Sequence, residues 1–362
     1  MDSSEGTSTP PRSGNPFAMR DFSDAPFLVT WELTRACALH CRHCRAAAIP
    51  DRNPGELSTS EAHRLLEQFA SLRPHPPFVV LTGGDATERP DLPSIIERSV
   101  SLGLVTDVAP SVTPRLTPET IASWSRAGVH TVSISLDGPT AEIHDRFRGV
   151  PGTFAASLRA ARSIVEQGLH LQINTSICPE TVGGLATMAT RVAELGAKRW
   201  ELFFVIGTGR ARELSALSAD ETEGALLWLA RHASIAPYRL TTVAAPQFRR
   251  VREQLAPSGL RSGAPVIKEG RGFAFVDHLG NVAPNGYLPL AAGNVRSEPF
   301  STIYRSSPLF RVLRDSSRLR GRCGRCPYRD VCGGSRARAY AETGDILAED
   351  PACPFRPEIA EA

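Results

Sequence analysis

The sequence predicts an α/β fold, a partial (β/α)6 barrel of the TIM type followed by a small C-terminal module. Two observations predict it. From Phe27 onward, short β-branched runs alternate with helical patterns, and after Pro237 this alternation stops. A repeated strand and crossover helix gives a parallel sheet, and six such units curl into a partial or full barrel. The loops at the carboxyl ends of the strands are then free for chemistry.

Six predicted strands each lead to a predicted helix. The strands are short β-branched or apolar runs, and the helices carry apolar residues three and four positions apart. In chain order, the strands cover residues 27–33, 77–81, 104–109, 129–136, 169–177 and 199–206, and the helices cover 58–72, 92–102, 118–127, 153–167, 182–195 and 220–232. In the C-terminal module, residues 272–276 and 281–283 predict a hairpin.

The domain boundaries follow from the same pattern. Residues 1–26 are rich in Ser, Pro, Gly and Asp and lack periodic apolar positions, which predicts a mobile tail. We expect the barrel to cover residues 27–236 and the C-terminal module to cover residues 237–362.

The charge of the chain is nearly balanced. Lys and Arg total 41, Asp and Glu total 38, and the net charge is +3. This balance creates no strong field over the whole protein, so we expect a small molecule or one protein as partner, and neither nucleic acid nor membrane. No apolar run approaches the roughly 20 residues that span a bilayer, and the N-terminus lacks a signal-peptide pattern. The expected compartment is the cytoplasm.

Seven of the eight cysteines fall into two groups near opposite ends of the chain. Disulfide frameworks are typical of short secreted chains, so tight groups in this longer chain indicate metal. The first group, Cys37, Cys41 and Cys44, follows the first predicted strand. Three thiolates on a cubane iron–sulfur cluster leave one iron open to chelate a small molecule. The alternative is a zinc loop with His40 or His43 as fourth ligand, but zinc loops usually separate paired ligands by two residues, and here the first gap is three.

This Cys-x3-Cys-x2-Cys motif resembles the signature of radical S-adenosylmethionine (SAM) enzymes, and the likeness runs from about Phe27 to Phe355. The resemblance implies that the reduced cluster cleaves SAM to methionine and a 5′-deoxyadenosyl radical, which abstracts hydrogen from a substrate. It also implies an electron donor of the flavodoxin or ferredoxin type. His43 matches the family position near the adenine of SAM, and the alternative is an ordinary loop residue.

The end of the second predicted strand resembles a SAM-binding loop of the family. Gly83 and Gly84 let the backbone approach a ligand, and Asp85 provides a carboxylate that can accept from the SAM ammonium group. The family more often has Glu at this place. Taken alone, the same three residues would predict an ordinary turn.

The end of the fourth predicted strand resembles another part of the SAM site. Ser135 and Asp137 lie on the same face of this strand, and Arg148 follows eleven residues after Asp137. The resemblance implies that Ser135 contacts the SAM ribose, that Arg148 pairs with the methionyl carboxylate, and that Asp137 holds these groups together. Without this spacing, Arg148 would predict a surface salt bridge. Asn174 and residues 207–210 also resemble cofactor contacts.

The second cysteine group supplies four thiolates: Cys323, Cys326, Cys332 and Cys353. Four thiolates can close every iron of a cubane, and zinc is the alternative for these four alone. The module resembles the SPASM extension of radical SAM enzymes, whose full form holds two auxiliary clusters. Asn285 stands where the full form commonly has a cysteine, and Ser335 and Arg336 follow Cys332 where another is common. We therefore predict one auxiliary cluster, two [4Fe–4S] clusters in total, and a packed thiol at Cys178.

Residues 332–350 most resemble those of enzymes that trim carboxylate side chains of heme precursors. The leading hypothesis is decarboxylation, or a related fragmentation or oxidation, of a small carboxylated metabolite, namely a tetrapyrrole or a sugar or nucleoside acid. The second hypothesis is a peptide maturase that forms a crosslink or an epimer, and the third is a non-catalytic electron carrier.

A carboxylated substrate favours contacts with cations, and four arginines are available: Arg210, Arg212, Arg336 and Arg338. The alternative is that these arginines are only solvated, as surface arginines often are. The radical mechanism requires no protein nucleophile, so no catalytic residue is predicted beyond the cluster. Asp277 and His278 on the hairpin turn are either relays of protons or radicals or, by the stronger interpretation, simple turn residues.

Overall fold

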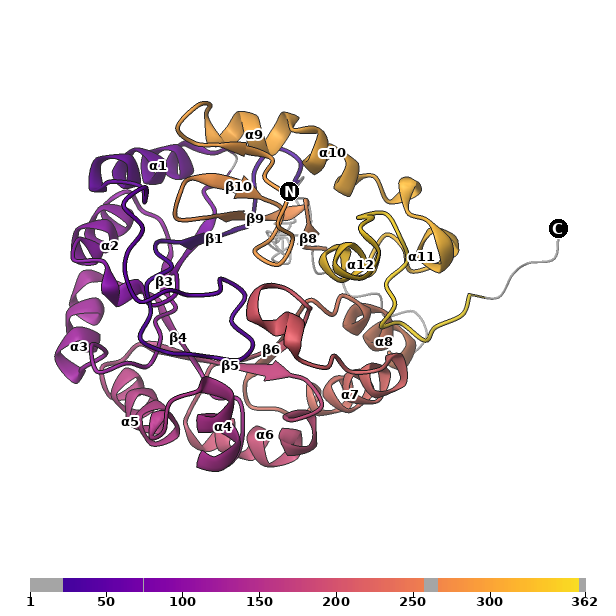
Figure 1. The fold of residues 1–362 in the computed structure, drawn as a ribbon, viewed down its shortest axis with the longest axis horizontal. Helices are drawn as coiled ribbons and strands as arrows, with labels where there is room; N and C mark the ends of the chain where they lie inside the picture. Colours follow the sequence, from indigo (N-terminus) through magenta and orange to yellow (C-terminus); the bar gives the residue numbers. More distant parts are fainter. Residues whose placement is uncertain (1–21, 74, 257–265, 358–362) are drawn as a thin grey trace, which may run out of the picture.

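The strands form a curved sheet inside a ring of helices (Figure 1). The computed structural model describes residues 22–73, 75–256 and 266–357.

The strands are, in chain order, β1 (Leu28–Glu32), β2 (Phe78–Thr82), β3 (Thr106–Val108), β4 (Thr131–Ser135), β5 (His170–Ile177), β6 (Arg199–Phe204), β7 (Arg239–Val243), β8 (Lys268–Glu269), β9 (Gly272–Val276), β10 (Asn281–Ala283) and β11 (Gly293–Asn294). They form one sheet in the order β11-β10-β9-β1-β2-β3-β4-β5-β6-β7, with β8 beside β9. The strands β1 to β7 pair parallel with their neighbours, and β9 pairs parallel with β1. The order ends in two different strands, so the barrel is partial.

The helices are α1 (Thr59–Ser71), α2 (Leu92–Ser101), α3 (Pro118–Ala127), α4 (Ala141–Arg148), α5 (Thr153–Glu166), α6 (Leu185–Glu194), α7 (Ala219–His232), α8 (Gln247–Leu255), α9 (Phe300–Ser306), α10 (Pro308–Arg314), α11 (Gly321–Arg325) and α12 (Arg336–Thr343). Short 3-10 turns are η1 (Ala86–Glu88), η2 (Val182–Gly184), η3 (Gly209–Glu213) and η4 (Ser316–Arg318). In Figure 1, α1 to α8 ring the sheet, and α9 to α12 fill the part of the ring between α1 and α8.

Each strand sends one set of side chains outward into the main apolar core. Trp31 of β1 packs edge-on against Phe69 of α1, with ring centroids 6.4 Å apart, and Trp200 of β6 is fully buried in the same core. Because side chains alternate along a strand, the next residues, Glu32 and Glu201, point into the barrel. The apolar core therefore lies between sheet and helices, and the inside of the barrel is polar.

The predicted fold class is confirmed, and each predicted strand and helix has its counterpart, with small shifts at the ends. The sequence pattern did not predict α4, and it did not predict that β7 continues the parallel sheet beyond residue 236. Residues 1–21 of the predicted tail lie outside the described residues. The last part of that tail was wrongly predicted, because Phe22 and Ala25 are buried (3% and 6% exposed) and the Tyr304 hydroxyl donates to Phe22 O.

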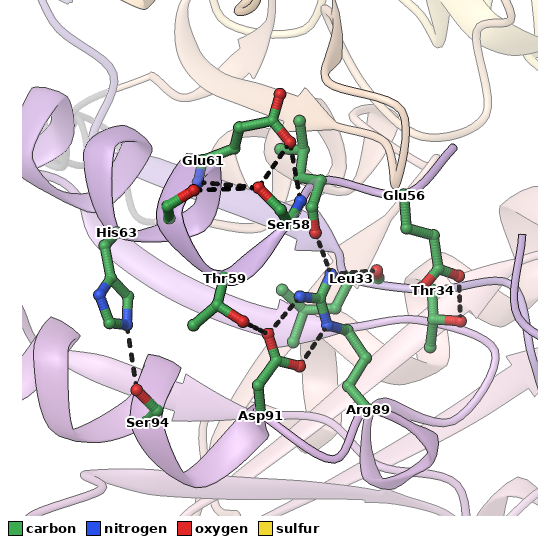
Figure 2. Close-up of polar contacts among 12 residues, drawn as sticks. Leu33, Thr34, Glu56, Ser58, Thr59, Glu61, His63, Arg89, Asp91 and Ser94 are labelled. Atoms are coloured by element: carbon green, nitrogen blue, oxygen red, sulfur yellow. Dashed lines mark hydrogen bonds and ion pairs between the residues drawn. The ribbon is translucent and has the colours of Figure 1, made fainter. Parts of the chain in front are cut away.

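The buried Arg89 side chain joins three segments at the start of the barrel through hydrogen bonds (Figure 2). Arg89 donates through Nε and Nη2 to the carboxylate of Asp91 at 2.9 and 2.6 Å, and through Nη1 to Leu57 O at 2.8 Å and Leu33 O at 3.4 Å. Thr59 at the start of α1 donates to the same carboxylate at 2.7 Å. The end of β1, the start of α1 and the start of α2 are thus joined below the loop that follows β1.

The first turn of α1 is also held by a capping box. Ser58 Oγ accepts from Glu61 N at 3.3 Å, and Glu61 Oε2 accepts from Ser58 N at 2.8 Å, so two backbone donors at the helix start are satisfied (Figure 2). Among the described residues, no helix combines the length and the apolar character that a membrane span requires.

Candidate active site

The first cysteine loop leaves β1 and folds back on itself. Cys37 N donates to Ile49 O at 2.9 Å and Ile49 N donates to Arg35 O at 3.0 Å, so the two ends of the loop pair like a short ladder. Arg35 Nη2 closes the loop by donating to Ala47 O at 2.8 Å. Ala47 has a φ of 45°, a left-handed conformation that is uncommon for a residue with a side chain. The three cysteines therefore lie on a tightly closed loop at the carboxyl edge of the sheet.

Two other loops support this one through close backbone contacts. Gly84 N donates to Thr34 O at 2.8 Å, and a Cβ on Gly84 would lie 2.5 Å from Ala36 O. A Cβ on Gly209 would lie 2.4 Å from Cys44 O, closer than real Cβ atoms approach. Glycine is needed at both positions because the cysteine loop is packed directly against the backbone.

Each sulfur of the loop has a hydrogen-bond donor beside it. Leu39 N donates to Cys37 Sγ at 3.4 Å, Ala48 N donates to Cys44 Sγ at 3.4 Å, and Arg148 Nη1 lies 3.6 Å from Cys41 Sγ. Burial raises the pKa of the Cys37 and Cys41 thiols. A buried thiol with a raised pKa loses its proton only when a bound metal supplies positive charge. The hydrogen-bond donors then stabilise the thiolates, so this set of cysteines and donors fits an iron–sulfur cluster.

Among the described residues, no three His, Cys, Asp or Glu side chains converge on a single metal position. A cubane binds one thiolate at each iron, so its ligands stand farther apart than those of one tetrahedral ion. The fit of the cysteines to a cluster therefore rests on the surroundings of each sulfur.

Arg148 and Asp137 form a buried ion pair at the end of β4. Arg148 Nε and Nη2 both lie 2.6 Å from Asp137 Oδ2, and Ser176 N donates to Asp137 Oδ1 at 2.8 Å. Although burial acts to raise the pKa of Asp137, the Arg148 charge and the other contacts hold it at about 2. The pKa of Arg148 stays above its usual value because of Asp137. Asp137 is therefore ionised, and it orients the guanidinium toward Cys41.

Two predicted cofactor contacts lie side by side. Ser135 of β4 is directly opposite Asn174 of β5 in the parallel register, and both are partly exposed. Asn174 Oδ1 accepts from Gln172 Nε2 at 2.8 Å, whereas the Ser135 hydroxyl and the Asn174 amide nitrogen make no hydrogen bond with another described residue. Both groups are available to a ligand above the strands.

His43 stacks on Phe147, with ring centroids 4.3 Å apart and the planes 10° from parallel. Burial lowers the pKa of His43 to about 3, so the imidazole is neutral. Its Nδ1 atom is buried and has no hydrogen-bond partner. The predicted position of His43 beside an adenine stays a prediction.

The Asp85 side chain is held in place by hydrogen bonds within the protein. Asp85 is fully buried, its Oδ1 accepts from Thr87 N at 3.0 Å, and its Oδ2 accepts from the Thr113 hydroxyl at 2.7 Å. Burial also raises its pKa. The carboxylate holds the turn in shape, and its predicted contact with the SAM ammonium group stays a prediction. The predicted approach of Gly83 and Gly84 to the same ligand likewise stays a prediction.

Glu32, Arg45 and His278 line one side of the barrel interior, and this polar wall was not predicted. Glu32 of β1 accepts from Arg45 Nη2 at 2.6 Å and lies 3.0 Å from His278 Nδ1, and all three side chains are at least largely buried. Arg45 also lies over the ring of Phe275, 4.7 Å from its centroid, and donates to Gly286 O at 3.2 Å. The residue after Cys44 thus links the cysteine loop to the C-terminal module. No local pattern in the sequence signals this link, which joins residues more than two hundred positions apart.

The facing wall is formed by β5 to β7. Glu201 accepts from Gln172 Nε2 at 3.0 Å and from the Thr241 hydroxyl at 3.0 Å, and burial raises its pKa. Asn174 and Glu201 are neighbours in the register of β5 and β6. Glu201 was not predicted from the sequence as a site residue, because its strand is largely apolar. Its inward position nevertheless follows from the alternation of side chains around Trp200.

Tyr287 brings a phenol from the C-terminal module to the same region. Its backbone N–H donates to Asn285 Oδ1 at 2.6 Å, and Leu288 N donates to the same atom at 2.9 Å. Burial raises the pKa of Tyr287 to about 12, with Arg45 and Glu201 among the charges that act on it. The Tyr287 hydroxyl makes no hydrogen bond with another described residue, so a neutral donor is available inside the barrel.

The four C-terminal cysteines line one cavity together with Gly333, Gly334 and Asp350: Cys323, Cys326, Cys332 and Cys353. Asp350 N donates to Cys323 Sγ and Gly334 N donates to Cys332 Sγ, both at 3.4 Å. A Cβ on Gly334 would lie 3.0 Å from Cys323 Sγ, and burial raises the pKa of Cys332 to about 12. A shared cavity lined by four thiols with backbone donors fits a fully ligated cluster.

Asn285 and Ser335, which stand where the full SPASM form commonly has cysteines, have structural roles. The Asn285 side chain holds the turn before Tyr287, and Ser335 Oγ accepts from Arg338 N at 3.3 Å at the start of α12. Cys178 is buried and pairs with Thr181, whose Oγ1 lies 3.7 Å from its sulfur, as expected of a packed thiol.

Three of the four arginines considered for a carboxylated substrate are bound within the protein. Arg210 donates to Cys41 O at 2.9 Å and to Ala48 O at 3.0 Å. Arg336 donates to Ala348 O at 2.6 Å, and Arg338 pairs with Asp350 at 3.3 Å. Arg212 alone of the four is exposed. Asp277 accepts from Leu279 N and Asn281 N and is a turn residue, whereas His278 reaches into the barrel.

Comparisons with known proteins agree with this arrangement. Residues 31–189 match the family model described as the radical SAM superfamily. The chain is 38% identical to the AdoMet-dependent heme synthase of Oleidesulfovibrio alaskensis, over 94% of this chain and 90% of that protein. It is also 38% identical to the AdoMet-dependent heme synthase of Methanosarcina barkeri, over 92% of this chain and 98% of that protein.

The fold is similar to that of Streptococcus suis SuiB bound to S-adenosylmethionine, with a TM-score of 0.73 and 15% identity over 92% of this chain and 78% of that chain. The identity to full-length relatives shows the family, and its members are enzymes that use a [4Fe–4S] cluster and SAM. The chain therefore belongs to the radical SAM superfamily, as its cysteine loop and barrel predict.

Proposed function

We propose that this enzyme removes a carboxylate, as CO2, from a side chain of a tetrapyrrole on the way to a heme. The similarity to heme synthases along almost the whole chain supports this substrate class most directly. The polar interior of the barrel supports it further, since a carboxylated substrate requires hydrogen-bond donors within reach of the radical.

Two clusters are assigned in this proposal. Cys37, Cys41 and Cys44 hold the cluster that binds SAM, and the cavity lined by the four C-terminal cysteines holds one auxiliary cluster. Bound and reduced, the first cluster supplies the electron that cleaves SAM to the 5′-deoxyadenosyl radical. The structural roles of Asn285 and Ser335 support a single auxiliary cluster.

The SAM contacts follow from the groups that the protein leaves free. The Arg148 guanidinium, oriented by Asp137, binds the methionyl carboxylate as a charge-assisted contact. The free Ser135 hydroxyl and Asn174 amide bind the polar edge of the nucleoside, and the backbone of Gly83 and Gly84 receives the ammonium group.

The substrate lies between the two polar walls, where Tyr287 donates a hydrogen bond to a substrate carboxylate. Its raised pKa keeps the phenol protonated at neutral pH, so it remains a donor. Arg45 stands nearby but is already paired with Glu32, so it contributes positive potential while its own geometry stays fixed.

The electron balance of the reaction is simple. Abstraction of one hydrogen atom leaves a carbon radical on the side chain. Loss of the carboxylate as CO2 then gives an alkene and releases one electron, which must pass to an acceptor. This requirement gives a purpose to a second redox centre in the chain.

The test is an anaerobic assay of the reconstituted protein with SAM, dithionite and iron coproporphyrin III, a tetracarboxylate for whose synthesis one relative is named. We expect 5′-deoxyadenosine and a tetrapyrrole product that has lost CO2 and two hydrogen atoms per side chain, both detected by mass spectrometry. A variant with Cys37, Cys41 and Cys44 all changed to Ala should form neither product. Cys178→Ala, which changes a packed thiol, should form both.

Formation of 5′-deoxyadenosine that a peptide stimulates and the tetrapyrrole does not would contradict the substrate class and favour peptide maturation. Metal analysis tests the clusters separately: about eight irons per chain are expected, and about four in the triple variant.

A further inference from the structure

The segment that carries two of the auxiliary-cluster cysteines is strongly basic. Residues 311–329 contain seven arginines and one acidic residue, in a chain whose net charge is only +3. The positive charge of the protein is thus concentrated here, and the rest of the chain carries a net negative charge. We call residues 311–329 the arginine segment.

Most of these arginines are exposed at the surface. They are Arg311, Arg318, Arg320, Arg325 and Arg329. Arg311, Arg318 and Arg325 form no ion pair with another described residue, while Arg320 is paired with Asp345 at 3.0 Å. The unpaired charges lie on α10, η4 and α11, at the outer edge of the C-terminal module (Figure 1).

The cysteines of the second group reach the surface in the same place. Cys323 and Cys326 lie within the arginine segment and are partly exposed, as is Cys353, while Cys332 is buried. Arg322 and Arg329 help to line the cavity that these cysteines share. η4, which carries Arg318, contacts α11, which carries Cys323 and Arg325, so exposed arginines lie beside this cavity.

We propose that the arginine segment is the docking surface for an acidic one-electron carrier protein. A carrier must bring its own centre close to this edge, and electron-transfer complexes are small interfaces, often below about 1,200 Å². Such complexes depend on complementary charge for orientation and for fast association. Unpaired arginines beside a partly exposed redox site fit an acidic partner.

The electron transfer balances with the reaction proposed above. Decarboxylation releases one electron per side chain, and an oxidised carrier that docks here is reduced by one electron and dissociates. The docking surface rests on the auxiliary cluster of the proposed function but not on the substrate class.

The test measures binding of an oxidised acidic [2Fe–2S] ferredoxin to the anaerobic holoenzyme by fluorescence anisotropy. The variant Arg311→Glu with Arg318→Glu removes two unpaired charges outside the cysteine motif. We expect Kd to rise at least tenfold in this variant at low salt, and the wild-type Kd to rise as salt screens the charges. In stopped-flow measurements, we expect the rate of electron exchange with the ferredoxin to fall by a similar factor in this variant.

The control is Arg159→Glu with Arg162→Glu, two exposed arginines of α5, on the far side of the ring from α11 (Figure 1). This control should bind the ferredoxin with a Kd within twofold of wild type. Iron content is measured for every variant, so loss of the auxiliary cluster is recognised independently of binding.

Two outcomes would overturn the proposal. In the first, both double variants bind the ferredoxin equally well. In the second, a redox-inactive protein of similar negative charge binds the wild type as tightly as the ferredoxin does, because the segment would then be a general surface for anions.

Discussion

Arg148 stands between a carboxylate and a cluster cysteine: its Nη2 lies 2.6 Å from Asp137 Oδ2, and its Nη1 lies 3.6 Å from Cys41 Sγ. The arginine is the last residue of α4, and Asp137 follows β4, so the end of one strand and the end of one helix fix the guanidinium over the cysteine loop. Two charged groups buried together in this way leave little freedom for the side chain.

Arg148→Lys should weaken SAM binding about tenfold or more, because one ammonium cannot replace a planar guanidinium that contacts several groups at once. Equilibrium dialysis of SAM against the iron-loaded protein measures the change. Arg146→Lys on the same helix alters an exposed residue 3.8 Å from Glu180 and should leave SAM binding unchanged. Equal effects of the two substitutions would rule out the assigned role of Arg148.

Gly209→Ala should disturb the cysteine loop. The added Cβ would lie 2.3 Å from Arg45 O and 2.4 Å from Cys44 O, so the loop must shift. We expect the SAM-dependent change in the electron paramagnetic resonance spectrum of the reduced protein to be lost or altered. Gly103→Ala is a matched control, because Gly103 also has a positive φ, of 75°, but has no atom within 4 Å of the new Cβ.

In the control, only the backbone penalty of about 1 kcal/mol is expected, seen as a lower melting temperature with an unchanged spectrum. An unchanged spectrum in Gly209→Ala would mean that the loop does not depend on this contact.

The fold could be predicted from the sequence because its signals are local. The alternation of strands and helices and the hairpin at residues 272–283 each lie within one short segment, and the structure has each of them. The cysteine motif and the spacing from Ser135 to Arg148 were equally visible, since they depend on a few neighbouring positions.

The contacts that the sequence did not reveal join distant segments. Arg45 binds Glu32 and Gly286, and neither pairing leaves a periodic or local mark. Asp85 was predicted as a cofactor contact because residues 83–85 resemble a SAM-binding loop, and nothing in the sequence indicated the hydrogen bond from Thr113, 28 positions later. Arg336 and Arg338 were considered as cations for a carboxylated substrate or as solvated surface residues, whereas both hold the C-terminal module together from α12.

Tyr287→Phe should raise the KM for the tetrapyrrole about tenfold, because removal of one hydrogen-bond donor to a charged group costs about 1.5 to 3 kcal/mol. SAM cleavage without substrate should be unaffected, so the ratio of 5′-deoxyadenosine to product should rise. Steady-state assays of both products measure the two effects. Tyr340→Phe is the control, since Tyr340 packs in the same apolar cluster and should change neither quantity. A matching rise in KM for both variants would indicate lost packing in place of a lost donor.

Asp91→Asn should lower the stability of the protein. Asp91 is held at a pKa of about 2 by Arg89 and Thr59, against the opposing effect of burial. The ion pair contributes about 1 to 2 kcal/mol at neutral pH, less than the full shift in pKa implies, because part of the Asp91 side chain is exposed and screened. The melting temperature of the variant should fall by about 2 °C or more.

The pH dependence of this difference has a definite sign. The pKa of Asp91 is lower in the folded than in the unfolded protein, so its contribution is complete above about pH 5 and is lost as the pH falls toward 2. The difference between Asp91→Asn and wild type should therefore be equal at pH 7 and pH 5. Glu67→Gln, which breaks an exposed pair with Arg98, should cost less than about 0.5 kcal/mol. A difference at Asp91 that does not shrink between pH 5 and pH 3 would show that the carboxylate has its ordinary pKa in the folded protein, and that Arg89 does not hold it ionised.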